Sequence, residues 1–91
     1  MPYTSTKEML LKAQRDGYAI AAFNFENMEM AQAIVAAAED LRAPVILQTT
    51  PGTVRYASPA LLAAIGRAVA EEACVPVALH LDHGSSVALA A

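Results

Sequence analysis

The sequence has one cysteine, no long apolar run and no leader-like segment. Its cysteine, Cys74, cannot form an internal disulfide, so a reducing cytoplasm is the expected compartment. No basic residue adjoins Cys74 to lower the pKa of its thiol, and we expect it to be a small buried hydrophobic residue. No apolar run approaches the roughly 18 residues of a membrane span. The first five residues lack the basic and apolar parts of a secretory signal, so none is predicted.

Charge is also scarce. Charged residues make up 16% of the chain, against roughly 25% in average soluble domains. The six basic residues are scattered and the formal net charge is -3, which argues against nucleic acid as a partner. Apolar residues reach 56% of only 91 residues, too many for so small a surface to cover with polar groups. The chain is expected to bury apolar surface against another chain, or to be the front part of a longer protein.

Helix signals recur along the chain. Ser5 and Glu8 form a capping box for a short helix that ends near Gly17. A second helix starts at about residue 27, because apolar residues recur there at helical spacing, and Pro44 forbids its continuation. A third helix begins with Ser58 as N-cap before a proline, buries Leu62, Ile65 and Val69, and stops before Pro76.

Three strands are predicted between these helices, over residues 18–25, 45–50 and 77–82. The first is mostly apolar, which suits a strand covered on both faces. The strands start about 26 to 32 residues apart with no hairpin signal, so they form a parallel α/β sheet through helical crossovers. That spacing matches the ~31 residues per unit of a (β/α)8 TIM barrel. An open doubly wound sheet is also allowed, although no Gly-x-Gly-x-x-Gly follows the first strand.

Each predicted strand ends in polar residues: Asn24, then Gln48-Thr49-Thr50, then Asp82-His83. Ligands bind at the carboxyl ends of parallel strands, so these residues are candidates for a site. Strand alternation makes His80 and Asp82 point one way together, and likewise Gln48 and Thr50. His83 faces elsewhere unless the strand has ended by then, as Gly84 suggests.

An Asp next to a His has several readings. The pair can be a proton carrier beside a metal ligand, a pair that orients a nucleophile, or a simple hydrogen bond. The nucleophile reading is the weakest, because Ser85 and Ser86 resemble N-cap residues of a following helix at about 87–91. We expect His80 to be a buried, hydrogen-bonded strand residue and not a ligand. Asn24 and Thr50 can equally serve as capping or turn residues.

Three segments carry a resemblance to a known family: Tyr18-Ala-Ile-Ala-Ala-Phe-Asn24, Ala43-Pro-Val-Ile-Leu-Gln-Thr-Thr50 and Leu79-His-Leu-Asp-His-Gly-Ser-Ser86. The chain resembles the N-terminal third of the class II, zinc-dependent fructose-bisphosphate and tagatose-bisphosphate aldolases. The resemblance covers essentially all 91 residues, and its most specific element is the His-x-Asp-His of the third strand. It implies a single TIM-barrel domain of which residues 1–91 are the first part.

The resemblance also implies roles for individual residues. Asp82 matches the proton carrier at the C4 hydroxyl of the ketose, and His83 matches one of three histidine ligands of a catalytic Zn²⁺. Thr50 occupies a position, usually serine, that contacts the triose-phosphate substrate, and Asn24 lies at the mouth of that pocket. The implied reaction belongs to carbohydrate metabolism, including glycolysis. It is the reversible aldol cleavage of a ketose 1,6-bisphosphate to glycerone phosphate and glyceraldehyde 3-phosphate.

Zinc serves this family as the Lewis acid, so no Schiff-base lysine is needed, and no lysine follows Lys12. The other two zinc histidines of the family lie on later strands, so the 91-residue chain alone is expected neither to bind zinc tightly nor to be active. Its open strand edges predict a homo-oligomer or a larger assembly.

Alternatives remain at this point. Thr50 and the Thr-Pro-Gly-Thr sequence that it opens look like the tagatose branch, whereas His83-Gly-Ser-Ser looks like the fructose branch. The sugar epimer is therefore open. A non-catalytic structural partner of a tagatose-bisphosphate aldolase, and an unrelated α/β binding module with a coincidental Asp-His, are the competing readings.

Overall fold

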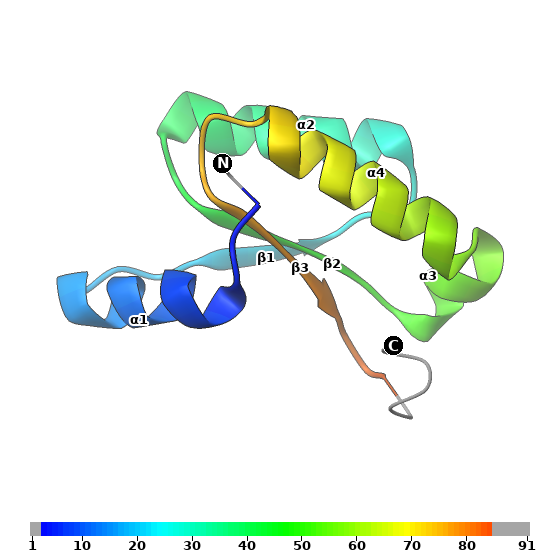
Figure 1. Cartoon of the computed structure of the whole chain (residues 1–91), viewed down its shortest axis with the longest axis horizontal. Coiled ribbons are helices and arrows are strands. Elements are labelled where there is room, and N and C mark those ends of the chain that lie inside the picture. Colours follow the sequence, from blue (N-terminus) through cyan, green and yellow to red (C-terminus); the bar gives the residue numbers. More distant parts are fainter. Residues whose placement is uncertain (1–2, 85–91) are drawn as a thin grey trace.

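A computed structural model of the chain describes residues 3–84, and it contains an α/β fold with one sheet (Figure 1). The elements are α1 Thr6–Asp16, β1 Ala21–Asn24, α2 Met28–Leu41, β2 Val45–Thr49, α3 Pro51–Tyr56, α4 Pro59–Glu72 and β3 Val77–Leu81. The three strands are parallel and lie in the order β1-β2-β3. The predicted α/β class and the alternation of strands with helices are confirmed. The predicted helix at 87–91 lies outside the described residues.

Local capping explains where the longer helices begin. The Ser5 hydroxyl accepts a hydrogen bond from the Glu8 backbone N–H at 3.3 Å, and the Ser58 hydroxyl accepts one from the Leu61 N–H at 3.0 Å. Each bond satisfies a backbone donor that the first helical turn leaves unpaired. Helix α1 ends at Gly17, whose φ of 77° lies in the left-handed region that glycine adopts without steric penalty. The predicted boundaries of these helices are confirmed.

Helices α2 and α4 pack side by side on one face of the sheet, and α1 lies on the other face (Figure 1). Strand alternation sorts the apolar residues between the two faces. Val45, Leu47 and Val77 belong to the core under α2 and α4. Ile46 and Ala78 point to the opposite face, where Met9 of α1 covers them. Because α1 covers only this part of the opposite face, the sheet's carboxyl end is left open on that side.

The N-terminal segment lies along the free edge of β3. Tyr3 forms a parallel bridge with Val77, and the Thr4 N–H donates to the Val77 carbonyl at 2.8 Å. The Arg67 guanidinium of α4 lies 5.2 Å from the centre of the Tyr3 ring, a cation–π contact. We call Tyr3 and Thr4 the N-terminal strap, because they tie this segment to both β3 and α4.

Strand β1 differs from the prediction in length and in burial. It has four residues where eight were predicted, and all four are exposed, with Phe23 at 52%. Within residues 3–84, β1 borders only β2, and the helices pack over β2 and β3 instead. The expectation of a strand covered on both faces is therefore wrong for the described part of the chain.

Two further expectations need correction. The sequence analysis did not predict α3, which begins at Pro51. The proline occupies the first helical position, where it needs no N–H donor. Cys74 is exposed, not buried. It lies in the short connection between α4 and β3, where its backbone N–H donates to the Glu39 carboxylate at 2.9 Å.

Candidate functional site

Strand register brings three polar residues into one row across the sheet. Asn24 is paired with Gln48, and Gln48 with His80. All three share the face that carries Ile46 and Ala78, opposite α2 and α4. Gln48 and His80 each lie two residues after one of these positions, and Asn24 is paired with Gln48. They stand at the carboxyl ends of the strands, so this row meets solvent where parallel sheets bind ligands.

Gln48 is the centre of a hydrogen-bond network. Its side-chain Nε2 donates to Asn24 Oδ1 at 2.7 Å and to Asp82 Oδ2 at 3.4 Å. Its Oε1 lies 3.2 Å from Nδ1 of His80. Because an amide oxygen only accepts, His80 must carry its hydrogen on Nδ1, and its Nε2 is then an acceptor in the neutral ring. One side chain thus fixes the orientation of an amide, a carboxylate and an imidazole from two neighbouring strands.

Asp82 and His83 follow directly after β3 ends at Leu81. The Asp82 N–H still donates to the Thr49 carbonyl at 2.7 Å, which holds Asp82 against β2. The His83 backbone then turns into the left-handed region, with φ at 57°. Its N–H donates to Asp82 Oδ1 at 3.1 Å, and its ring Nε2 lies 3.6 Å from Asp82 Oδ2. The turn therefore redirects His83 beside Asp82 instead of to the opposite face of the strand.

This arrangement gives Asp82 two different oxygen environments. Oδ1 accepts from a backbone N–H, whereas Oδ2 faces Gln48 and the His83 ring. The Asp82 side chain is 35% exposed and the His83 side chain 78% exposed, so both can reach a ligand at the open edge. The Asp82 carboxylate, whose orientation is fixed by hydrogen bonds, can accept or donate a proton. The exposed His83 ring beside it can do the same or bind a cation through a ring nitrogen.

The metal-binding capacity of the described residues is limited. Among residues 3–84 there is no group of three or more His, Cys, Asp or Glu side chains placed to hold one ion. A catalytic zinc site takes three protein ligands and an open position. His83 has an exposed ring nitrogen that suits one of the three. These residues therefore fit part of a zinc ligand set and do not complete one.

His80 is exposed, so the expectation of a buried strand residue is wrong, although its predicted hydrogen bond is present. Its face of the sheet is the one that α2 and α4 do not cover. Asn24 is the last residue of β1, and its side chain bonds to Gln48 instead of capping a helix. Sequence analysis grouped Gln48 with the polar strand ends but gave it no role; pairing it with Asn24 in parallel register would have identified the network.

Thr50 belongs to a second, separate cluster. It is the N-cap residue of α3, but its side chain makes no capping bond. Its hydroxyl lies 3.4 Å from the hydroxyl of Thr53, which donates to Glu26 Oε1 at 3.3 Å. In the part of the chain that the structure describes, no hydrogen bond joins Thr50 to the network around Gln48. Thr53 and Glu26 were not predicted, and their spacing in sequence gives no signal for them.

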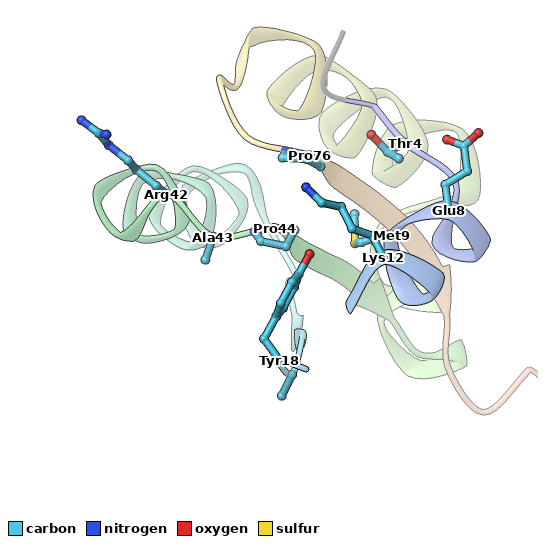
Figure 2. Close-up of a pocket in the computed structure, with 10 residues that line it drawn as sticks. Thr4, Glu8, Met9, Lys12, Tyr18, Arg42, Ala43, Pro44 and Pro76 are labelled. Atoms are coloured by element: carbon cyan, nitrogen blue, oxygen red, sulfur yellow. The ribbon is translucent and has the colours of Figure 1, made fainter. Parts of the chain in front are cut away.

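A cavity of about 700 Å³ lies at the opposite end of the sheet. Pro44 and Pro76, which directly precede β2 and β3, line it together with Met9 and Lys12 of α1 (Figure 2). Figure 2 shows the Lys12 ammonium of α1 and the hydroxyl of Tyr18, which lies in the connection between α1 and β1, approaching this space. None of the candidate residues lines this cavity, so its position at the amino ends of the strands separates it from the site.

No helix in the described range is both long and apolar enough to cross a membrane.

Comparison with known proteins shows similarity along nearly the whole chain. The family model described as "Fructose-bisphosphate aldolase class-II" matches residues 4–91. The chain is 50% identical over 84 residues to a D-tagatose-1,6-bisphosphate aldolase subunit GatY of Klebsiella oxytoca, covering 92% of this chain and 30% of that protein. It is 52% identical over 79 residues to a fructose-bisphosphate aldolase of Thermus caldophilus, covering 87% of this chain and 26% of that protein.

A solved structure shows the same arrangement of elements. The YdjI aldolase of Escherichia coli superposes with a TM-score of 0.89 at 33% sequence identity, covering 97% of this chain and 34% of that chain. The chain thus spans 26% to 30% of the length of the two curated relatives above. The three parallel strands and their helices correspond to about a third of the solved structure.

Proposed function

This chain belongs to the class II fructose-bisphosphate aldolase family, and on that premise we propose that it forms the N-terminal part of a single (β/α)8 aldolase domain. The proposed reaction is the reversible aldol cleavage of fructose 1,6-bisphosphate to glycerone phosphate and glyceraldehyde 3-phosphate. The observation that supports it best is the Asp82 carboxylate, held between Gln48 and His83 at the carboxyl end of β3. A TIM barrel carries its catalytic groups at this end of its strands.

Asp82 is the proposed proton carrier at the C4 hydroxyl of the ketose. In cleavage it removes the hydroxyl proton, and in condensation it returns it. Enzymes of this family are generally zinc-dependent, and a Zn²⁺ held here would supply the Lewis acid that polarises the substrate carbonyl. His83 is the proposed zinc ligand from this chain. The role of Gln48 is to hold the Asp82 carboxylate in place, and His80 supports Gln48 from β3.

Thr50 and Asn24 are the proposed substrate-binding residues of this chain. Asn24 accepts a hydrogen bond from Gln48, which also donates to Asp82, so its amide group belongs to the same hydrogen-bond network as the proposed catalytic carboxylate. We place the protein in the cytoplasm as a homo-oligomer, with sugar bisphosphates and triose phosphates as its small-molecule partners. Several large apolar side chains remain exposed in residues 3–84, including Leu41 at 78%, which favours burial against further chain or a partner.

Tagatose 1,6-bisphosphate is the second candidate substrate. The 50% identity to the GatY subunit favours it, as does the sequence Thr-Pro-Gly-Thr from Thr50 to Thr53. In the same branch, the protein could serve as a structural partner without catalysis. Turnover assays with both ketose bisphosphates separate these three possibilities, since a structural partner turns over neither.

The proposal is tested with Asp82→Ala in the full-length protein. We expect turnover to fall by about 100-fold or more, the usual contribution of a positioned acid or base. Zinc content, measured by atomic absorption, should stay near that of the wild type, because Asp82 is not a proposed ligand. Asp40→Ala, at an exposed carboxylate of α2, is the matched control and should leave turnover unchanged. Loss of zinc together with turnover would show that the role assigned to Asp82 is wrong.

A further inference from the structure

We infer that Arg55 of α3 binds a phosphate group of the substrate and is thereby a specificity residue for phosphorylated sugars. The inference rests on the proposed function, because it takes a ketose bisphosphate as the substrate. It deepens that function by adding a substrate-binding residue that is distinct from Thr50 and Asn24.

Only one basic side chain of the described chain lies at the carboxyl end of the sheet. The six Lys and Arg residues are Lys7, Lys12, Arg15, Arg42, Arg55 and Arg67. Three of them belong to α1, Arg42 shortly precedes β2, and Arg67 of α4 lies against Tyr3 beside the start of β3. Arg55 belongs to α3, which begins two residues after β2 ends. Within residues 3–84 it is therefore the one Lys or Arg at the end of the sheet that carries the proposed site.

Gly52 locates the guanidinium of Arg55. A β-carbon added to this glycine would lie 3.8 Å from Thr50 Oγ1 and 4.0 Å from Arg55 Nη2, so the two groups flank the same point. Thr50 has an extended backbone, with φ -119° and ψ 166°, and the alternation that places Gln48 on the face of the site continues to it. Gly52 is exposed, so a ligand can enter the space between the hydroxyl and the guanidinium.

The Arg55 side chain has no partner among residues 3–84. It is exposed, and its guanidinium makes no hydrogen bond or ion pair with any side chain or backbone group in that range. The Glu26 carboxylate contacts α3 through the Thr53 hydroxyl, at 3.3 Å, and not through Arg55. The N–H donors of Arg55 are therefore available to a ligand.

Phosphate is the part of the proposed substrate that fits this group. The planar fork of a guanidinium matches two oxygens of one phosphate, and both hydrogen bonds are charge-assisted. The substrate has two phosphate groups and no carboxylate, so its phosphates are the only anions that Arg55 can bind. Asp82 is an acid and His83 is the proposed zinc ligand. Arg55 is thus the described residue at this end of the sheet that supplies a permanent positive charge.

The test measures binding and turnover in the full-length protein. Arg55→Met removes the guanidinium and keeps an unbranched apolar stem. KM for the ketose bisphosphate, and the dissociation constant of inorganic phosphate measured by calorimetry, should each rise about tenfold, the loss of charge-assisted hydrogen bonds at an exposed site. We expect kcat to change less than about threefold. Arg55→Lys keeps the charge but not the two-point fit, so its constants should lie between those of Arg55→Met and the wild type.

Arg42→Met is the matched control. Arg42 is an exposed arginine at the opposite end of the strands, so its loss should leave both constants within about twofold of the wild type. The condensation direction identifies the phosphate that Arg55 binds. Glycerone phosphate and glyceraldehyde 3-phosphate carry one phosphate each, and the one that Arg55 contacts should show the raised KM in Arg55→Met.

The inference is overturned if Arg55→Met leaves both constants near those of the wild type, or if Arg42→Met weakens phosphate equally. A lower free energy of unfolding in Arg55→Met with unchanged phosphate binding would also overturn it, because Arg55 then pairs with an acidic group of the protein. A wild-type protein that turns over neither ketose bisphosphate, yet loses phosphate affinity in Arg55→Met, overturns the proposed function alone.

Discussion

Gln48 provides the sharpest test of what orients the Asp82 carboxylate. One substitution at Gln48 removes its hydrogen bonds, and another replaces the donor with an oxygen that repels the same acceptors. Gln48→Met keeps the length of the side chain and removes the amide. Gln48→Glu keeps the shape almost unchanged but replaces the Nε2 donor by a carboxylate oxygen. That oxygen would face Asn24 Oδ1, 2.7 Å from the present nitrogen, and Asp82 Oδ2, 3.4 Å from it.

The structure gives the expected size of each effect. Gln48 is half-buried and makes three side-chain contacts, so we take the low end of the usual range, roughly 0.5 kcal/mol each. Their loss in Gln48→Met lets Asp82 leave its orientation and should lower kcat/KM about threefold to tenfold. In Gln48→Glu, two charges at such a distance repel by about 1 kcal/mol in water and about 4–5 kcal/mol at an effective dielectric constant near 20. We therefore expect at least a further tenfold loss.

The assay is kcat/KM for aldol cleavage, measured with a coupled enzyme that consumes the triose product. The same substitutions at Gln14, an exposed glutamine of α1, are the matched controls and should have no effect. The diagnostic result is the order of the variants, since the closer mimic in shape should be the worse enzyme. If Gln48→Glu is more active than Gln48→Met, Nε2 does not donate to Asp82 and the network described above is wrong.

Two further predictions concern the scaffold. Gly17→Ala should lower the free energy of unfolding by about 1 kcal/mol in denaturant titrations, because alanine is strained at φ 77°. The control is Gly52→Ala, which lies in a helix with the nearest side-chain atom 3.8 Å away and should not lower it. Equal losses in the two variants would contradict the argument. The hydrogen bond with the Glu39 side chain, followed by desolvation, raises the pKa of the Cys74 thiol, so reactive thiolate forms only at higher pH. Glu39→Gln should shift the pH profile of alkylation by iodoacetamide to lower pH, and Glu71→Gln should not; an unmoved profile in Glu39→Gln would refute that cause.

Much of the fold could be predicted because its signals are local. Ser5, Ser58 and Pro44 act within one helical turn or one backbone bond, so a sequence reveals the helix boundaries that they set. The exposure of β1 could not be predicted in this way. Burial depends on which elements pack above a strand, and an apolar strand such as 21–24 looks the same whether or not anything covers it.

The site residues likewise fall into those with a local sequence signal and those that depend on contacts between distant segments. Asp82, His83 and Asn24 could be singled out as candidates because each lies at or next to the end of a predicted strand, and parallel strands present their ends together. The central role of Gln48 needs the register of two strand pairs, and register is fixed by packing between strands far apart in sequence. The contact of Thr53 with Glu26 joins residues 27 positions apart, and α3, which positions Thr53, was itself not predicted. The roles of these residues in catalysis stay predictions.

The N-terminal strap has a consequence for how the sheet can grow. The Thr4 N–H donates to the carbonyl of Val77, on the edge of β3 that faces away from β2. A fourth parallel strand must therefore begin its ladder further along, near Leu79, and so be offset toward the carboxyl end. Closed barrels require such a stagger between successive strands. In the proposed barrel, Tyr3 and Thr4 would therefore set how far the next strand is offset along β3.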